Sequence, residues 1–215
     1  MLEITQKGLV GWDNSLIHDL KEEFAEKRCI VLPQLINEQV LQKMIAKLDS
    51  AVFFENEHLD IENKQFATDQ TLKANSLVLH QIHLLLNNAL LFQAIEEITG
   101  CRGIKGFSGR IYRNMPNTDH RLDWHDDTDD NTRLIGISMN LSDEKYTGGV
   151  FQIRKKNTTD ILREVPCGSI GDAHIFMVSH ELQHCVTKTT GEHARTAAAG
   201  WFMSTPFSGL PILNN

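Results

Sequence analysis

The first part of the chain carries apolar side chains at helical spacing. Leu16, Leu20 and Phe24 recur every four residues, which places them on one face of a helix. Asn14 precedes this stripe and is the predicted N-cap, because its short polar side chain can accept hydrogen bonds from free N–H groups. The apolar run Cys-Ile-Val-Leu-Pro at 29–33 predicts a buried strand that ends at its proline.

Two further helical stretches follow, with a polar stretch between them. The first is predicted to start after Asn37, and its apolar stripe consists of Val40, Leu41, Met44, Ile45, Leu48 and Val52. Residues 54–75 are polar and without a period, which predicts a long loop, and loops of this length often act as lids. Residues 77–99 are again helical, in two pieces, and Gly100 is the predicted end.

After Gly106 the apolar period changes to two. The short runs that predict strands are 110–112, 134–141, 150–153, 161–165, 173–178 and 196–202. Several short strands at such spacing are typical of an all-β sandwich or barrel. We therefore predict a mainly β protein with N-terminal helices, and a single domain over 1–215. Within it, about 1–105 would form a helical scaffold and lid, and about 106–205 a barrel core.

Composition and charge narrow the possible partners. The chain has 215 residues, 21 basic against 28 acidic, and a net charge of −7. Nonspecific binding of nucleic acid needs a clustered basic face, so we expect no such partner. The N-terminus lacks the basic and apolar regions of a secretory signal. No apolar stretch approaches the roughly 20 residues that span a bilayer, so we expect no membrane partner either.

The cysteines point to a reducing compartment. Cys29, Cys101, Cys167 and Cys185 are far apart and form no Cys-x-x-Cys pair. In a chain of this size, such spacing predicts free thiols rather than a disulfide framework. We therefore expect a cytoplasmic protein, and the sequence leaves its oligomeric state open.

Trp124-His125-Asp126-Asp127 is the first candidate metal motif. On a strand, His125 and Asp127 would leave the same face, because side chains alternate between faces. A second imidazole from a neighbouring strand would complete a 2-His-1-carboxylate set. That set leaves several positions open on Fe(II), enough for a 2-oxo acid and dioxygen.

A second motif competes with the first. Residues 180–184 read H-E-x-x-H, which on a helix would give two zinc ligands and make Glu181 the general base of a peptidase. Catalytic zinc needs a third protein ligand, but no Asp or Glu follows Glu192. Thr190 stands where a third histidine would be required, and the threonines around it disfavour a long helix. A zinc metallopeptidase therefore remains as the alternative.

The wider set of motifs decides between these two. In chain order they are His125-x-Asp127, Gly148-Gly149, Gly171-Asp172, His184-x-Val186, Gly191, Arg195 and Gly200-Trp201-Phe202. This order resembles the Fe(II)/2-oxoglutarate-dependent oxygenase superfamily, and most of all the group that contains the prolyl 4-hydroxylase catalytic domains. Residues 24–33 and the helix after them are similar to the start of phytanoyl-CoA dioxygenase-like members. The resemblance covers about 24–205 and implies a double-stranded β-helix, a jelly-roll barrel with iron at its open mouth.

The resemblance assigns roles to single residues. His125 and Asp127 match the first two iron ligands, and His184 matches the third because it lies eleven positions before Arg195. Arg195 matches the arginine that binds the C5 carboxylate of 2-oxoglutarate, a task suited to a planar guanidinium. The other histidines lie too far from Arg195 or too close to it, and they are His174, His180 and His193.

One position departs from the family pattern. Many relatives carry a hydroxyl two residues after the arginine, and this chain has Ala197 there. Tyr112 is our candidate for the missing contact with the cosubstrate, and Arg110 shares its strand face. The acidic side chains near the metal motif form a solvated loop, or else some of them contact a cationic substrate or orient His125, and they are Asp119, Asp123, Asp126, Asp129 and Asp130.

These observations together predict an activity. The related halogenases have Gly or Ala where this chain has Asp127, so the resemblance implies hydroxylation. We predict an Fe(II)- and 2-oxoglutarate-dependent dioxygenase that uses O2 to hydroxylate a small-molecule, amino-acid or peptide substrate, with succinate and CO2 as co-products. No catalytic residue is expected beyond the metal ligands. The alternatives are the zinc metallopeptidase and a barrel that binds a metabolite without turnover, and the sequence does not specify the substrate.

Overall fold

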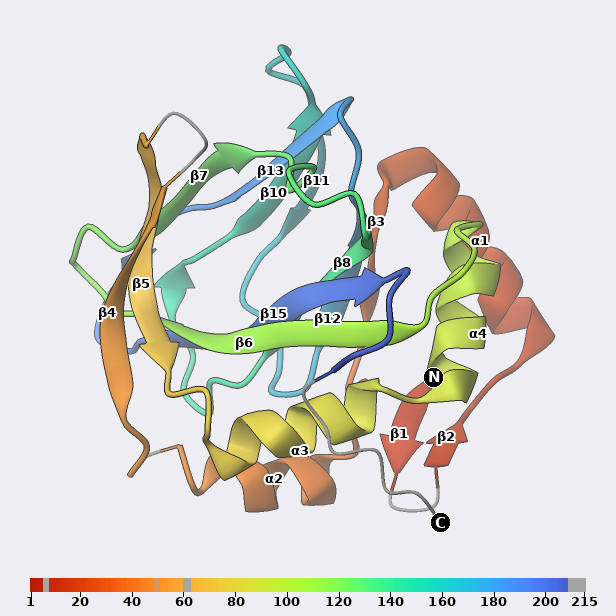
Figure 1. Ribbon diagram of the computed structural model, residues 1–215, viewed down its shortest axis with the longest axis horizontal. Helices are drawn as coiled ribbons and strands as arrows, with labels where there is room; N and C mark the ends of the chain where they lie inside the picture. The colour runs from red at the N-terminus through yellow and green to blue at the C-terminus, as the bar shows by residue number, and fades with distance from the viewer. Residues whose placement is uncertain (6–7, 49, 60–62, 209–215) are drawn as a thin grey trace.

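The computed structural model describes residues 1–5, 8–48, 50–59 and 63–208, and Figure 1 shows its architecture. The predicted helices are present as α1 (Asn14–Lys27), α2 (Glu38–Ile45), α3 (Leu77–Leu86) and α4 (Ala89–Thr99). The N-cap of α1 is Asp13 rather than Asn14, because the Asp13 carboxylate accepts the first free N–H groups of the helix. α2 is shorter than predicted and ends at Ile45. Gly100 ends α4 in a left-handed conformation, as predicted.

Strands make up most of the rest. In the first half they are β1 (Glu3–Thr5), β2 (Gly8–Val10), β3 (Cys29–Leu32), β4 (Phe53–Leu59) and β5 (Gln65–Leu72). In the second half they are β6 (Gly106–Asn114), β7 (Arg121–His125), β8 (Arg133–Asn140), β9 (Thr147–Gly148), β10 (Phe151–Lys155), β11 (Ile161–Val165), β12 (Ala173–Met177), β13 (Leu182–Val186), β14 (Thr189–Thr190) and β15 (Arg195–Met203). Every run predicted as a strand after Gly106 falls on one of them.

One large antiparallel sheet forms the body of the molecule. Its strand order is β11-β10-β13-β7-β5-β6-β15-β8-β12-β3, and β4 pairs with β5 outside this path. The sheet curves into a nearly closed barrel (Figure 1). Two small separate sheets consist of β1 with β2 and of β9 with β14.

The first half of the chain, predicted as a helical scaffold and lid with a strand at 29–33, also contributes strands to this barrel. β3 extends the sheet beside β12, and β5 pairs with both β6 and β7. The predicted loop at 54–75 is wrong, since most of it is the β4–β5 hairpin. Residues 60–62 of that range lie outside the described residues. A hairpin replaces the loop because its polar strands gain backbone hydrogen bonds from the barrel edge.

Cross-strand register directs polar side chains into the barrel. Arg195 on β15 lies opposite Asn114 on β6, and Ala197 lies opposite Tyr112. β8 adds Ser138 to the same face from the other side of β15. Residues directly opposite each other in an antiparallel pair share a face, so these side chains line one interior wall.

The helices cover the outside of the barrel. In Figure 1, α1 and α4 lie side by side at one end, and α2 and α3 lie along the adjacent edge. Their apolar faces join the sheet in one hydrophobic core, whose largest buried members include Phe24, Ile82, Leu91, Phe107 and Phe202. No single helix in the described part is long and apolar enough to cross a membrane; α3 and α4 meet that criterion only as a pair bent by 61°.

Candidate metal centre and its pocket

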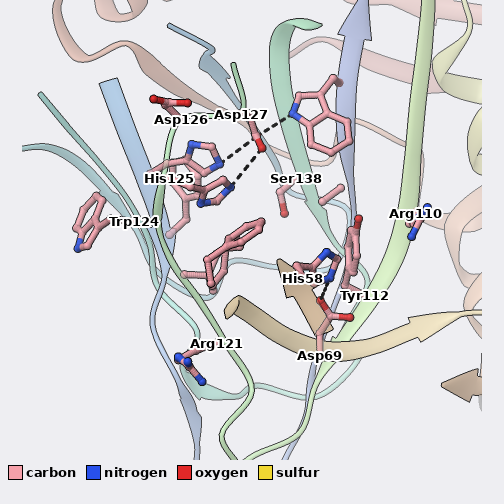
Figure 2. Close-up of a pocket in the computed structure, with 18 of the residues that line it drawn as sticks. His58, Asp69, Arg110, Tyr112, Arg121, Trp124, His125, Asp126, Asp127 and Ser138 are labelled. Carbon is pink, nitrogen blue, oxygen red and sulfur yellow. Dashed lines mark hydrogen bonds and ion pairs between the residues drawn. The ribbon is translucent and has the colours of Figure 1, made fainter. Parts of the chain in front are cut away.

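The barrel holds a cavity of about 860 Å³. The β4–β5 hairpin forms one side, and β6, β7, β8, β13 and β15 form the others (Figure 2). Its aromatic lining consists of Phe66, Tyr112, Trp124, Phe151, Phe176 and Trp201. The cavity also reaches His125, Asp127, His184 and Arg195, so every residue predicted for the site lies on its wall.

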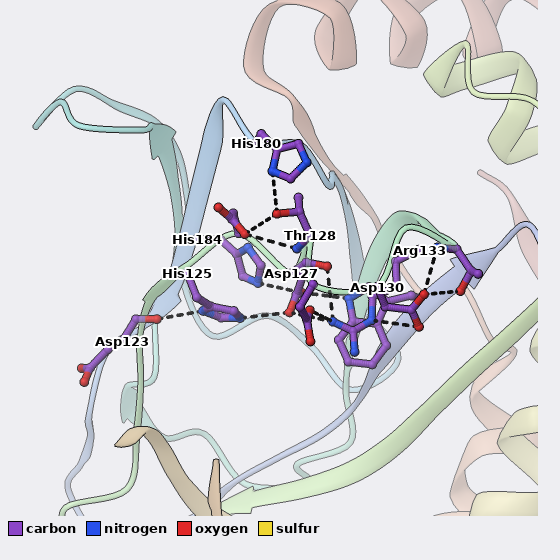
Figure 3. Close-up of polar contacts among 12 residues, drawn as sticks. Asp123, His125, Asp127, Thr128, Asp130, Arg133, His180 and His184 are labelled. Carbon is purple, nitrogen blue, oxygen red and sulfur yellow. Dashed lines mark hydrogen bonds and ion pairs between the residues drawn. The ribbon is translucent and has the colours of Figure 1, made fainter. Parts of the chain in front are cut away.

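His125, Asp127 and His184 converge in this cavity (Figure 3). His125 lies directly opposite His184 on the paired strands β7 and β13, and the two ring centroids are 4.2 Å apart. Oδ1 of Asp127 is 3.3 Å from Nε2 of His125, and Oδ2 is 3.3 Å from Nε2 of His184. One possible ligand atom from each residue lies within 4.8 Å of the others, and the described residues contain no second cluster of this kind.

Asp127 reaches the cluster through a turn and not through strand alternation, which corrects the predicted geometry. β7 ends at His125, and the Asp127 backbone is left-handed with φ 59°. This conformation is uncommon for a residue with a side chain and needs support from its surroundings. Trp201 Nε1 donates a hydrogen bond to Oδ2 of Asp127 at 2.8 Å, and Arg133 donates to the main-chain oxygen of Asp127 at 3.3 Å. Two distant strands therefore hold the turn that delivers the carboxylate.

The protonation states of these side chains are set by their contacts with one another. Burial lowers the pKa of His125, but the hydrogen bond and negative charge of Asp127 outweigh burial and raise this pKa, so a bound cation would replace a proton on this ring. Nδ1 of His125 lies 2.8 Å from the carbonyl oxygen of Asp123, which places the ring N–H there and leaves Nε2 free to bind a metal. Burial raises the pKa of Asp127, but hydrogen bonds to the two imidazoles outweigh burial and hold this pKa well below its usual range. Burial lowers the pKa of His184, which favours the neutral ring that metals require. Two imidazoles and one carboxylate on one side form the donor set of non-haem iron(II), so the residues present fit that metal.

The zinc-peptidase arrangement does not form. His180 and Glu181 lie in an exposed turn and His184 lies on β13, so 180–184 is not helical. The hydroxyl of Thr128 lies 2.8 Å from Nδ1 of His180, away from the cluster (Figure 3). This alternative is therefore not favoured.

Arg195 is a buried cation in the same cavity. It is 7% exposed, and its guanidinium donates hydrogen bonds to Oδ1 of Asn114 at 3.3 Å and Oγ of Ser138 at 3.2 Å. No carboxylate of the described residues forms an ion pair with it. A buried cation without an anionic partner is costly, so the pocket around Arg195 is suited to an anionic ligand.

Tyr112 lies on the interior wall opposite Ala197, as its strand position suggested. Burial raises the pKa of Tyr112 to about 12, and the charges that act on its phenol are Arg110, Asp69, Asp127 and Arg133. The centroid of the Tyr112 ring lies 6.0 Å from that of the His58 ring on the hairpin. Its predicted contact with the cosubstrate stays a prediction.

The acidic side chains near the metal motif are each paired with a basic one. Asp119 pairs with Lys188 at 2.7 Å, and Asp126 pairs with Lys156 at 2.7 Å. The remaining pairs are Asp123 with Arg121, and Asp129 and Asp130 with Arg133. We call these five acidic residues and their basic partners the paired rim. Four basic side chains serve these five carboxylates, because Asp129 and Asp130 share Arg133, so most of the negative charge of the rim is compensated within the protein. The rim therefore gives little support to a cationic substrate.

Several residues that shape the cavity were not identified from the sequence. Ser138 is a polar residue within an apolar strand, and Trp201 lies six residues after Arg195, hence on the same strand face. Counting strand faces from Arg195 would have found Trp201. The hairpin adds His58 and Asp69, whose Nε2 and Oδ2 atoms are 2.8 Å apart (Figure 2). That pair was missed because its strands were predicted as a loop.

Comparison with known proteins shows what the barrel is similar to. Residues 110–203 match the family model described as the 2OG-Fe(II) oxygenase superfamily, and this segment contains the metal cluster and Arg195. No curated protein matches the sequence.

Solved structures share the fold at low sequence identity. An oxidoreductase of the 2OG-Fe(II) oxygenase family from Burkholderia pseudomallei is 13% identical with a TM-score of 0.66, over 96% of this chain and 97% of that one. A prolyl-4-hydroxylase from Pseudomonas putida is 15% identical with a TM-score of 0.62, over 88% and 99%. The epimerase SnoN, in complex with Fe3+, alpha ketoglutarate and nogalamycin RO, is 9% identical with a TM-score of 0.62, over 94% and 91%.

These structures confirm the predicted jelly-roll, double-stranded β-helix fold. The sequence match to 110–203 is independent of them and covers the residues that carry the chemistry. Residues 110–203 are therefore similar to the 2OG-Fe(II) oxygenase superfamily, and their His-Asp-His cluster fits iron(II) as a cofactor with 2-oxoglutarate and O2 as cosubstrates.

Proposed function

We propose that this protein is an Fe(II)- and 2-oxoglutarate-dependent hydroxylase of a small-molecule, amino-acid or peptide substrate, with succinate and CO2 as co-products. The observation that carries the proposal is the presence of the metal-donor cluster and the buried Arg195 in one cavity. A 2-oxo dicarboxylate has one end that chelates a metal and another that needs a cation. The cavity presents groups for both ends.

The protein residues bind and orient in this reaction. His125, Asp127 and His184 would hold iron(II), and Arg195 would fix the far carboxylate of 2-oxoglutarate with charge-assisted hydrogen bonds. When bound, iron(II) supplies the redox chemistry by which O2 converts 2-oxoglutarate to succinate and CO2 and oxidises the substrate. Phe151 and Phe176 pack against the His184 ring, with centroid distances of 5.7 and 4.5 Å, and keep water from this side of the cluster.

The substrate would occupy the outer part of the cavity, between the cluster and the hairpin. The Phe66 ring lies 5.1 Å from the His125 ring, so an organic group placed there would contact both a flat apolar surface and the metal centre. Asp127 supplies a carboxylate where the related halogenases have none, which supports hydroxylation. The similar structures include a prolyl-4-hydroxylase and an epimerase, so the fold itself does not select one substrate class.

Spectroscopy and product analysis test the proposal. Anaerobic protein with Fe(II) and 2-oxoglutarate should develop a weak visible charge-transfer band, and O2 should then release succinate. The band should be absent from Asp127→Ala protein. A band that persists in this variant would refute the ligand assignment.

The same experiments separate the alternatives. Chelator-sensitive peptide cleavage that is lost in Glu181→Gln protein would favour the zinc peptidase. Binding of 2-oxoglutarate without succinate across a broad substrate panel would favour a non-catalytic barrel. As part of the proposal we keep the cytoplasmic location, in accord with the free thiols of the cysteines.

A further inference from the structure

A second, smaller cavity of about 190 Å³ is also lined by Arg195. Arg195, Ser138 and Phe151 line both cavities. Tyr146 and His174 line only the smaller one. We call Arg195, Ser138, Tyr146 and His174 the inner chamber, because they line this smaller cavity, and no described residue of the β4–β5 hairpin lines it.

Tyr146 and Arg195 approach a common point. Both are buried, at 8% and 7% exposure. A Cβ built on Gly149 would lie 2.8 Å from Cδ of Arg195 and 2.9 Å from Cε2 of Tyr146, and the Gly149 backbone has φ 58°. Any other residue at position 149 would push the two side chains apart. The second glycine of the Gly148-Gly149 motif therefore allows the tyrosine to lie against the arginine.

Polar atoms around this point have no partner in the described structure. They are Nε2 of His174 and Oγ1 of Thr189, both buried. Oγ1 of Thr189 is 3.2 Å from the Cβ position built on Gly149, and His174 lies opposite Ser138 across β12 and β8. Buried polar groups are almost always hydrogen-bonded in folded proteins, so these atoms point to a ligand with several oxygen atoms.

The chain contains two tyrosines, and they lie in different electrostatic surroundings. Arg195 acts on the Tyr146 phenol, together with the Cys167 thiol. The charges that act on Tyr112 do not include Arg195. Tyr112 lines the main cavity but not the smaller one. A carboxylate bound to Arg195 would therefore meet the hydroxyl of Tyr146 before that of Tyr112.

We infer that Tyr146, and not Tyr112, supplies the hydroxyl that Ala197 lacks. With Arg195 and Ser138 it binds the distal carboxylate of 2-oxoglutarate, and Tyr112 faces the part of the main cavity that takes the substrate. This inference rests on the proposed function. It assigns the inner chamber to one end of a dicarboxylic 2-oxo acid.

Because the chain has only two tyrosines, Tyr146→Phe and Tyr112→Phe are matched variants that each remove one phenolic oxygen. Their dissociation constants are measured anaerobically by calorimetry with the Fe(II)-loaded protein. The two probes are 2-oxoglutarate and 2-oxopentanoate, which has the same chain length but ends in a methyl group. The ratio of the two constants isolates the contribution of the distal carboxylate.

In Tyr146→Phe protein, 2-oxoglutarate should bind at least about tenfold more weakly, because a hydrogen bond to a charged group is lost. The affinity for 2-oxopentanoate should stay unchanged, which also shows that the variant is folded. In Tyr112→Phe protein, both constants should stay within about twofold to threefold of the parent values. An unchanged ratio in Tyr146→Phe protein, or a loss in Tyr112→Phe protein instead, would overturn the inference.

A failure of the proposed function gives a different result. Parent protein loaded with Fe(II) would then show no preference for 2-oxoglutarate over 2-oxopentanoate. A clear preference in the parent that neither tyrosine variant reduces would leave the proposed function standing and refute only the role of Tyr146.

Discussion

The paired rim and the barrel interior differ in how their charges are satisfied. At the rim, each acidic residue near the metal motif has a basic partner within the protein, as in the 2.7 Å pair of Asp126 and Lys156. In the interior, Arg195 is buried without any carboxylate partner among the described residues, and two imidazoles and a carboxylate crowd within 4.8 Å. The charges of the rim are mostly compensated by partners at the surface, whereas Arg195 in the interior is buried and, among the described residues, lacks a partner of this kind.

Unpaired buried charges locate the functional site more reliably than the density of charged residues does. The rim holds many acidic residues in a short segment, and from the sequence it could have been a surface for a cationic substrate. Exposed ion pairs are weak and common, so a dense cluster of them says little about binding. A single buried charge without a partner says much more, because it is retained against a large desolvation cost.

The largest effect should come from the metal ligands. His184→Ala should weaken Fe(II) binding by more than about 100-fold, since a ligand matters more than its surroundings do. His180→Ala, the other histidine of the H-E-x-x-H segment, should leave Fe(II) affinity unchanged because it contacts Thr128 at the rim. Calorimetric metal titration measures both. Equal losses of Fe(II) affinity in the two variants would mean that His180 contributes to metal binding as much as His184 does.

Next comes the buried arginine. Arg195→Met should weaken 2-oxoglutarate binding by about 100-fold, because two charge-assisted hydrogen bonds are lost. Arg121→Met, at the rim, should leave this affinity unchanged, since Arg121 is paired with Asp123 at 3.1 Å. Anaerobic binding titrations compare the variants. Comparable losses would mean that the rim also binds the cosubstrate.

A smaller effect should follow from Trp201. Trp201→Phe keeps an aromatic ring but removes the N–H that lies 2.8 Å from Oδ2 of Asp127. Loss of such an orienting contact typically costs a factor of about 10 in metal affinity. We expect the affinity for Fe(II) to fall about tenfold in a calorimetric titration. The melting temperature should stay unchanged, which excludes misfolding as the cause. Unchanged affinity would mean that the left-handed turn of Asp127 holds without the indole.

The smallest effect should come from breaking a rim pair. Lys156→Met removes the partner of Asp126, and partly exposed pairs contribute at most about 1 kcal/mol to stability. Denaturant unfolding should show this small loss at low salt and less at high salt. Fe(II) and 2-oxoglutarate affinities should not change. A large change in either affinity would make the rim part of the site.

Most strands in the second half of the chain and the residues of the site could be predicted from the sequence. The strands of the barrel bury one face, so apolar residues alternate along them, and the site residues occur at recognisable spacing. The prediction failed at 54–75, because β4 is mostly polar and the buried positions of β5 include Asp69 besides Ala67 and Leu72, so no apolar period marks the strands. It also failed on the Asp127 turn, which depends on a contact with Arg133 six residues later and on a contact with Trp201 far along the chain. Long-range contacts of this kind leave no local signal.

The double pairing of β5 has a consequence for how the protein can be divided. β5 is hydrogen-bonded to β6 through Gln70 and Thr71 and to β7 through Ala67 and Thr68. It is the strand that joins the two halves of the large sheet. The segment that matches the family, 110–203, therefore lacks a strand that closes its own barrel, and an autonomous folding unit has to begin upstream of residue 65.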